Sequence, residues 1–415
     1  MEPDKKIVCQ QKNSRKLLRV SFLGHFFNDV YWFIIPLMLP SIKAEFNLTY
    51  TQSGLLLTSY TLIGAFGSLV SGYLGDRTGR RFMLSWGFFI ASLALVLCAL
   101  SSNYWQFFLI LILFGVGISV FHPSMVAVLS NSFTRKRGTI LGLFQLWGVM
   151  GAFSAVLVIS FLTKIFPGWR GILLVLSIPG FVFAPVFFKS LKPLLANQSS
   201  ITYINEKKNN SHVSFSREKK ITPLAFVTFL IANTLFIITI QGVINFIPTY
   251  LVEAKSFSLT FAGYAFSIVI AGGFFGAIAS GKASDKLSPL TALKIFVAFG
   301  GPLIIIITLL ESSSWLIIFL AIYGISYSGV WAPQQAYLAE NTPQHARGGV
   351  YGLIFFLIAV VGAIAPGITG FIADQFGLSS ALKIITIPVF ISLALLFSLK
   401  RYPSFFLSCV TFFSG

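Results

Sequence analysis

Long apolar runs recur along this chain and decide which folds it can adopt. Each has about 20 residues, the length of helix that crosses a bilayer and roughly twice that of a membrane β-strand. Hydrocarbon offers no partners to backbone N–H and C=O groups, so these runs must satisfy them as helices. The sequence therefore predicts an all-α integral membrane protein. We identify twelve transmembrane helices, at residues 20–41, 53–74, 82–100, 105–129, 139–162, 171–189, 223–251, 261–281, 291–310, 315–338, 349–372 and 380–399.

The amount and position of charge agree with a membrane protein. Charged residues make up only 10% of the chain, against about 25% in soluble domains. The net charge of +18 could suggest nucleic-acid binding, but the basic residues lie on one side of the predicted spans. With the N-terminus inside, all lysines and arginines are internal except Lys43, Lys164, Arg170, Lys255 and Lys383. This asymmetry predicts a cell-membrane protein with both termini cytoplasmic, facing anionic lipid and not nucleic acid.

A polar stretch rich in Asn, Ser and Lys divides the runs into two sets of six. The predicted parts are a cytoplasmic N-terminal segment (1–19), an N-terminal six-helix bundle (20–189), a cytoplasmic linker (190–222), a C-terminal six-helix bundle (223–400) and a cytoplasmic or interfacial tail (401–415). The halves also repeat. Asp76 recurs as Asp285, and Pro123 recurs as Pro333 at nearly the same offset. We therefore expect two pseudo-symmetric bundles.

The most distinctive short motif, Gly72 to Arg81, lies between the second and third runs. Charge this dense cannot lie in hydrocarbon, so we expect a short loop at a membrane face, turned by its glycines. Charged residues at corresponding positions elsewhere could join it in an inner-gate network. The expected members are Gly72, Asp76, Arg77, Gly79, Arg80, Arg81, Asp285, Glu340 and Arg347.

Asp29 falls near the middle of the first run, where an ionised carboxylate is costly unless it is paired or hydrated. His25 lies four residues earlier, on the same helical face, and His122 precedes Pro123 in the fourth run. We expect Asp29, His25 and His122 to couple transport to protons. The alternatives are a carboxylate held in a structural hydrogen bond and a histidine satisfied between helices.

Amide and aromatic side chains inside other runs are candidates for substrate contact. They could bind a molecule with flat or apolar parts and a few polar groups. The alternative is an aromatic face packed against lipid or a neighbouring helix. The candidates are Asn28, Gln145, Gln241, Asn245, Tyr327, Trp331, Gln334 and Gln335.

The sequence gives no sign of an enzyme. We find no nucleophile–base pair, no phosphate-binding loop that would support ATP-driven pumping, and no metal cluster. The three cysteines have neither disulfide nor metal spacing. We therefore expect no cofactor and no metal.

The pattern Gly-x-Leu-x-Asp-Arg-x-Gly-Arg-Arg at 72–81 resembles the loop between helices 2 and 3 of the major facilitator superfamily. That resemblance implies two parallel six-helix halves and secondary transport by alternating access. Two further segments, Gly24–Asp29 and Phe121–Pro123, resemble the fosmidomycin-resistance-type subgroup. This second resemblance implies proton-driven export of drug-like compounds.

The chain differs from drug antiporters of this superfamily in two places. It has no arginine inside the fourth run and no Gly-Pro antiporter motif in the fifth. We expect proton-coupled export of a small organic molecule by antiport, with proton-coupled uptake by symport as the alternative. A non-transporting receptor or scaffold is an alternative of a different class. The expected partners are the substrate, protons and membrane lipids, and the expected state is a monomer.

Overall fold

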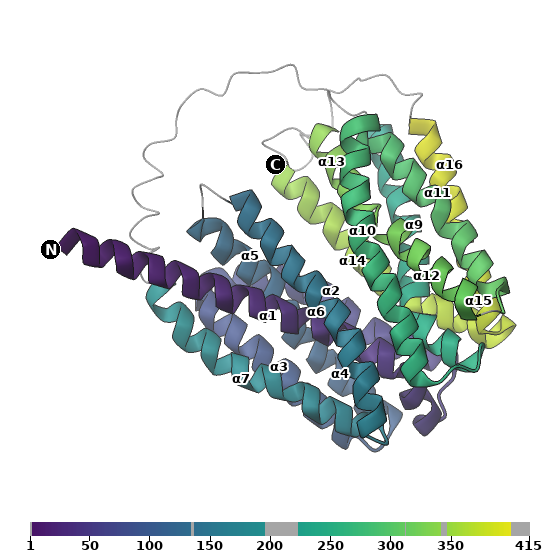
Figure 1. The fold of residues 1–415 in the computed structure, drawn as a ribbon, viewed down its shortest axis with the longest axis horizontal. Coiled ribbons are helices and arrows are strands. Elements are labelled where there is room, and N and C mark those ends of the chain that lie inside the picture. Colours follow the sequence, from purple (N-terminus) through teal and green to yellow (C-terminus); the bar gives the residue numbers. More distant parts are fainter. Residues whose placement is uncertain (1, 134–136, 196–222, 312, 342–346, 400–415) are drawn as a thin grey trace. The chain divides into compact units, whose positions relative to one another are not determined.

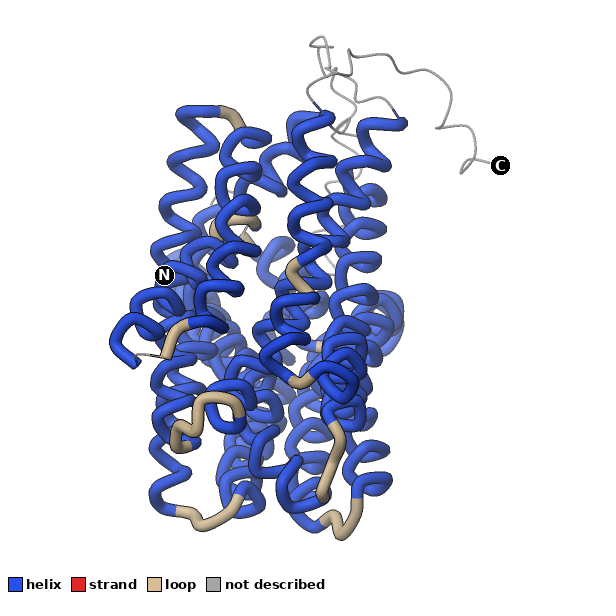
Figure 2. Tube along the Cα trace, turned by 90° about the vertical axis from the view of Figure 1, so that its right-hand side faces the viewer, coloured by secondary structure: helices blue, strands red, loops and turns tan. Residues whose placement is uncertain are grey.

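The computed structural model describes residues 2–133, 137–195, 223–311, 313–341 and 347–399 (Figure 1). Within these ranges the regular elements are α-helices joined by short connections, without strands (Figure 2). The helices are α1 (Glu2–Phe46), α2 (Tyr50–Thr78), α3 (Arg80–Leu100), α4 (Tyr104–Ser119), α5 (Phe121–Ser132), α6 (Arg137–Ile165), α7 (Trp169–Leu195), α9 (Pro223–Glu253), α10 (Leu259–Leu287), α11 (Pro289–Leu309), α12 (Ser313–Ser328), α13 (Trp331–Asn341), α14 (Arg347–Phe376), α15 (Leu378–Ile384) and α16 (Ile387–Ser398).

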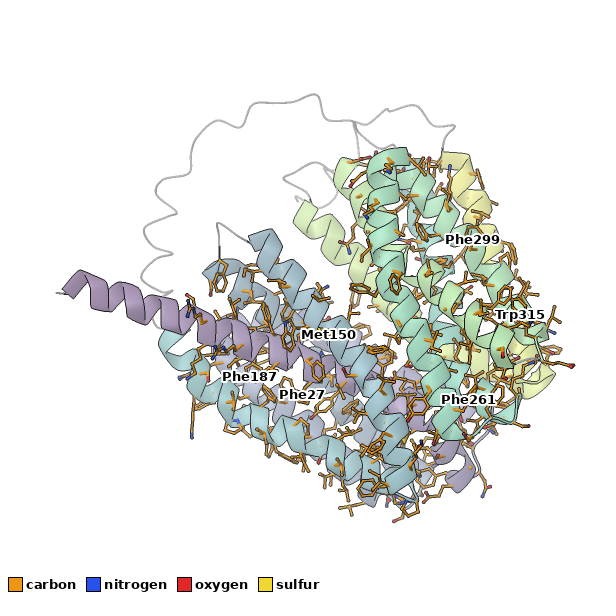
Figure 3. All side chains as sticks on the ribbon, viewed as in Figure 1. Phe27, Met150, Phe187, Phe261, Phe299 and Trp315 are labelled. Carbon is orange, nitrogen blue, oxygen red and sulfur yellow. The ribbon has the colours of Figure 1, made fainter. Side chains whose placement is uncertain are left out.

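The prediction of twelve spans is confirmed. In the described part of the chain, twelve helical segments are long and apolar enough to cross a membrane. Three of them combine two helices: α4 with α5, α12 with α13, and α15 with α16. Large apolar side chains also cover the outside of the helices, as Phe299 and Trp315 show in Figure 3, with 56% and 58% of their surface exposed. Lipid solvates such a surface without the cost that water would impose.

The chain divides into two compact units. The first comprises Met1–Ile42 and Ser59–Ser214, and the second comprises Lys43–Thr58 and Phe215–Gly415. Each unit has its own buried aromatic core, with Phe107 and Phe114 in the first and Phe229 and Phe236 in the second. The end of α1 and the beginning of α2 therefore belong to the second unit, although the rest of both helices belongs to the first.

One helix contact is repeated in both units and supports the internal repeat. A Cβ added at Gly115 of α4 would lie 2.5 Å from the carbonyl oxygen of Tyr60 in α2. A Cβ at Gly324 of α12 would overlap the carbonyl oxygen of Val269 in α10 in the same way. Both residues of the second pair follow those of the first by the offset that relates Asp76 to Asp285. Glycine thus allows backbone-to-backbone packing of equivalent helices in both halves.

Paired prolines interrupt the fourth and tenth spans at equivalent places. Pro123 has no N–H for the carbonyl four residues earlier, and the chain breaks between α4 and α5 at Val120. Pro333 follows the equivalent break between α12 and α13. After each break the helix begins again, with Ser124 N donating to Val120 O (3.4 Å) and Gln334 N donating to Val330 O (3.1 Å).

Two boundaries differ from the expected ones. The segment Gly72–Arg81 is not a loop, because α2 continues to Thr78 and α3 begins at Arg80. A helix satisfies its own backbone in water as well as in lipid, so charge at a membrane face does not end it. Gly79 alone reverses the chain, with a φ of 92° that L-residues rarely adopt. At the N-terminus, α1 begins at Glu2 and includes the segment 2–19 that the sequence separated from the first span. The residues 196–222 of the expected linker and the tail 401–415 lie outside the described residues.

We expect Gly79→Ala to destabilise the protein by about 1–3 kcal/mol, because alanine must adopt the strained positive φ. The matched control is Gly142→Ala, an exposed helical position of α6 where an added Cβ meets none of the described atoms within 4 Å. Alanine in a helix interior is favoured over glycine by about 0.5–1 kcal/mol, so this control should be neutral or stabilising. Thermal unfolding of the two purified variants in detergent measures the difference. Equal unfolding temperatures would contradict the assigned turn.

Candidate functional site

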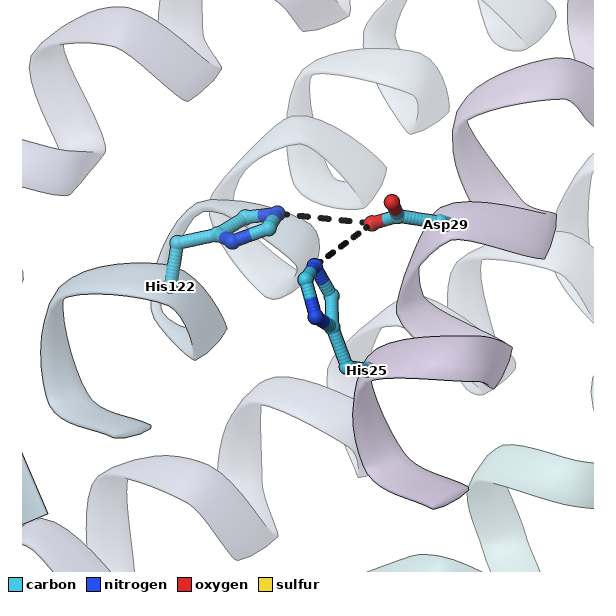
Figure 4. A group of neighbouring side chains, drawn as sticks. All are labelled: His25, Asp29 and His122. Atoms are coloured by element: carbon cyan, nitrogen blue, oxygen red, sulfur yellow. Dashed lines mark ion pairs between the residues drawn. The ribbon is translucent and has the colours of Figure 1, made fainter. Parts of the chain in front are cut away.

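Three ionisable side chains meet inside the first unit. His25 and Asp29 lie one turn apart on α1, and His122 lies at the start of α5, just after the break before Pro123. Asp29 Oδ1 is 3.5 Å from His25 Nε2 and 3.4 Å from His122 Nε2 (Figure 4). We call His25, Asp29 and His122 the interior triad.

The triad is buried on one side and accessible on the other. The side chains of His25, Asp29 and His122 are 2%, 21% and 41% exposed. The His25 ring stacks on Phe144, with ring centroids 3.9 Å apart, and Phe121 lies at 5.9 Å. These aromatic rings cover the His25 side of the triad, whereas His122 is its most exposed member.

One backbone carbonyl determines which nitrogen of His25 carries a proton. His25 Nδ1 is 2.6 Å from the carbonyl oxygen of Phe144, which can only accept, so Nδ1 donates. In the neutral ring Nε2 then has no proton, yet it faces Asp29 Oδ1. A favourable contact between these two acceptors requires a proton on one of them.

His122 also directs an acceptor nitrogen at Asp29. The Asn28 amide nitrogen lies 3.3 Å from His122 Nε2 and donates to it, so Nε2 of the neutral ring is also an acceptor. Both imidazole acceptors therefore face Asp29 Oδ1, a buried atom without a hydrogen-bond donor among the described residues. One proton placed between Asp29 Oδ1 and His25 Nε2 would satisfy both atoms.

Two glycines on α6 make room for the triad. A Cβ added at Gly148 would lie 2.5 Å from Asp29 Oδ2 and 2.6 Å from His25 Nε2. A Cβ at Gly151 would overlap the backbone carbonyl oxygen of Phe26. The small residues of α6 thus bring it against α1 and position the Phe144 carbonyl for His25.

The other candidates for substrate contact are distributed over the two units. Asn28 belongs to the triad environment, whereas Gln145 on α6 has an exposed side chain. In the second unit, Asn245 Nδ2 donates to the Gln241 backbone oxygen at 2.8 Å and to its side-chain oxygen at 3.3 Å.

Two aromatic residues of the tenth span, Tyr327 and Trp331, pack against the apolar core of the second unit. Tyr327 and Trp331 are half-buried there, beside Phe296 and Val330. Gln334 is fully buried, and its side-chain amide has no hydrogen-bond partner among the described residues, whereas Gln335 is exposed.

The candidates for the inner-gate network are only partly described. Arg77 is exposed, Arg80 is half-buried, and the Arg81 guanidinium lies 5.1 Å from the centre of the Phe188 ring. In the second unit, the Asp285 and Glu340 side chains are exposed. Gly79 is the turn residue described above. The structure describes no side-chain position for Gly72, Asp76 or Arg347.

A second polar cluster in the second unit was not expected from the sequence. Asp374, near the end of α14, accepts hydrogen bonds from the backbone N–H groups of Tyr50 (2.7 Å) and Thr51 (2.8 Å). These are the first residues of α2, so the carboxylate caps that helix. Glu253 accepts from the Tyr50 hydroxyl at 2.7 Å and pairs with Lys43 Nζ at 3.2 Å. We call these five residues the α2 cap cluster. The sequence did contain one indication of this cluster. Asp374 and Glu253 are among the few acidic residues of the chain, and both flank predicted spans on the same outer side as Lys43.

Comparison with known proteins places these features in a family. The family model described as Major Facilitator Superfamily matches residues 21–366 and 304–406. A putative metabolite transport protein of Haemophilus influenzae is 25% identical over 382 residues, which cover 90% of this chain and 92% of that protein. The fosmidomycin resistance protein of Escherichia coli is 23% identical over 380 residues, 90% of each chain. The structure of a bacterial homologue of the human lysosomal transporter Spinster has the same fold, with a TM-score of 0.78 at 16% identity, covering 94% of this chain and 97% of that one.

We expect Gly148→Ala to destabilise the protein by about 1–3 kcal/mol, because the added methyl group overfills a closely packed contact. The expected destabilisation is specific to Gly148, because the new Cβ would approach both His25 and Asp29. Gly142→Ala, two turns earlier on the same helix, is the control. Thermal unfolding should separate the two, and a Gly148→Ala protein as stable as the control would contradict the close packing of α6 on α1.

Proposed function

This chain belongs to the major facilitator superfamily and is a membrane transporter, and from that premise we propose that it couples the export of a small organic molecule to proton entry. The observation that carries this proposal is the interior triad. Among the described residues, the buried Asp29 Oδ1 has no hydrogen-bond donor, and it faces His25 Nε2, an acceptor in the neutral ring, so a favourable contact between these two atoms requires a proton. Relatives and fold are transporters, so no enzymatic chemistry is assigned to these residues.

Proton sharing offers a route from the triad to coupling. With Asp29 ionised and both rings neutral, the triad carries a negative charge that is costly to bury inside the membrane. A proton between Asp29 and either histidine neutralises the charge and makes a hydrogen bond. The neutral form of the triad is favoured when the site is closed to water. The ionised form is favoured when the site is open and water can solvate the charge. If substrate binding releases the proton from the triad, movement of the substrate is coupled to uptake and release of that proton.

The α2 cap cluster holds the beginning of α2 within the second unit. Residues Lys43–Thr58 belong to that unit but continue on both sides into the first. We propose that Asp374 and Glu253 keep this segment attached to the second unit during transport.

The direction of transport has two candidates. Similarity to a fosmidomycin resistance protein favours export, because a transporter protects a cell most directly by removing the toxic compound. Similarity to a putative metabolite transport protein favours a metabolite as substrate and supports proton-coupled uptake as the second candidate. Growth on toxic substrates separates the two, since an exporter protects the cell and an importer sensitises it.

The proposal includes a location and a set of partners. The basic residues on one side of the spans support a cell-membrane protein with cytoplasmic termini, in contact with anionic lipid. The triad is complete within one chain, so a monomer suffices for the proposed coupling. The remaining candidates for substrate contact, from Gln241 to Gln335, are proposed to line the substrate path in the second unit, together with Asn28 and Gln145 in the first. The inner-gate network, with Asp76 and Arg347 as members, is likewise proposed.

We expect Asp29→Asn to abolish transport driven by a pH gradient while leaving exchange of substrate between two sides measurable. Asparagine keeps the size of the side chain but cannot take up or release the proton. The measurement uses proteoliposomes, an imposed pH gradient and a panel of compounds that includes fosmidomycin. Glu311→Gln, which neutralises an exposed carboxylate beyond the end of α11, is the matched control. Gradient-driven transport that persists in Asp29→Asn would remove this residue from the coupling mechanism.

We expect Asp374→Ala to open the α2 cap cluster more often, because loss of a helix cap costs about 1–2 kcal/mol, a factor of about 5–30 in population. A cysteine at Ser53, a fully buried position of α2, reports the opening through its rate of modification by a membrane-impermeant maleimide. Replacing the native Cys9, Cys98 and Cys409 provides the background. Glu311→Ala should leave the rate unchanged. A rate that does not rise in Asp374→Ala would show that the cap does not control this end of α2.

A further inference from the structure

The interior triad has the composition of a site for a transition-metal ion. It offers two imidazoles and one carboxylate, and the three ligand atoms lie within 4.8 Å of one another. Imidazole nitrogen selects ions of the zinc class, whereas Ca²⁺ and Mg²⁺ prefer oxygen ligands alone. We propose that His25, Asp29 and His122 bind a divalent transition-metal ion, with Zn²⁺ as the best match.

The measured separations agree with a tetrahedral ion. Zn–N and Zn–O bonds of about 2.0–2.2 Å place neighbouring ligands of a tetrahedron about 3.3–3.5 Å apart. Asp29 Oδ1 is 3.5 Å from His25 Nε2 and 3.4 Å from His122 Nε2. These are two edges of such a tetrahedron. The ligand atoms of the two histidines lie within 4.8 Å of each other, so metal binding requires the half-exposed His122 side chain to adjust.

The surroundings of the ligands fit the same ion. A metal-binding histidine usually donates its second ring N–H to a carbonyl or carboxylate, which fixes the tautomer. His25 Nδ1 already donates to the Phe144 carbonyl and leaves Nε2 directed at Asp29. Asp29 Oδ1 is a buried acceptor that an ion would satisfy. At His122 the metal replaces the hydrogen bond from Asn28 to Nε2.

Three protein ligands leave one coordination position open. Since His122 is the most exposed member of the triad, we place this position on its side. Water or an anionic group of a substrate completes the shell there. A bound ion takes the same lone pairs as the shared proton, so Zn²⁺ inhibits transport. This last consequence rests on the proposed function, whereas the binding itself does not.

The experiment measures metal binding directly on the purified full-length protein. Co²⁺ replaces Zn²⁺ as a spectroscopic probe, because its visible bands are intense in a tetrahedral site and weak in the octahedral aquo ion. His212→Ala and His345→Ala remove the other two of the four histidines and define the parent protein. We expect the parent to bind one Co²⁺ with a tetrahedral spectrum, to release it to Zn²⁺, and to unfold at a higher temperature with Zn²⁺ present.

The variants test whether the triad supplies the ligands. His25→Gln, Asp29→Asn and His122→Gln should each weaken Co²⁺ and Zn²⁺ binding at least about 10-fold, the lower end of what loss of a supporting group costs. Glu311→Gln is the control. His122→Gln, at the half-exposed position, is the variant that folding tolerates best, and size-exclusion chromatography verifies the fold of each protein. Affinities that are equal in all these proteins, or an octahedral spectrum in the parent, overturn the proposal.

The result is separable from the test of proton coupling. A parent that binds no Co²⁺ while Asp29→Asn loses gradient-driven transport overturns the metal site and leaves the proposed function in place. Tetrahedral binding that requires the triad, in a protein whose Asp29→Asn variant still transports normally, supports the metal site and removes the proton relay. Zn²⁺ inhibition of the parent together with tetrahedral binding supports both.

Discussion

Hydrocarbon forms no hydrogen bonds, and the structure depends on this constraint. Each spanning segment satisfies its backbone as a helix, and departures from helical geometry occur where the chain has a specific reason for them. Pro123 withholds one N–H and interrupts the fourth span, and Pro333 does the same in the tenth. His122 directly follows the first of these breaks and lies beside Asp29 of α1, so the candidate site is next to a local loss of backbone hydrogen bonding.

The same constraint gives the Phe144 carbonyl its importance. By accepting the His25 Nδ1 proton, this oxygen leaves Nε2 as an acceptor facing a carboxylate. It can do so because Gly148 and Gly151 allow α6 to approach α1 to backbone distance. The geometry of the triad therefore depends on two residues without side chains. Any residue larger than glycine at Gly148 would occupy the volume of the triad itself.

Much of the fold could be predicted from the sequence, because run length and charge asymmetry are properties of the chain alone. The twelve spans follow from them, and the recurrence of Asp76 as Asp285 and of Pro123 as Pro333 indicated that the halves correspond. The charged segment before Gly79 was wrongly expected to be a loop, since a membrane face permits helix as readily as loop. His25 and Asp29 could be paired by helical spacing. Their contact with His122 depends on tertiary packing, because His122 lies 94 residues after Asn28 in the sequence. The cap of α2 by Asp374 depends on tertiary packing in the same way, and sequence spacing does not encode either contact.

The repeated contact of Gly115 with Tyr60 and of Gly324 with Val269 shows how far the two halves still share one architecture. The triad does not share it. By the offsets of the repeat, Asp29 corresponds to Ile238 and His122 to Ala332, neither of which can ionise. The repeat thus keeps the helix packing without the ionisable side chains of the triad. Two halves that share helix contacts therefore differ in their interior charge.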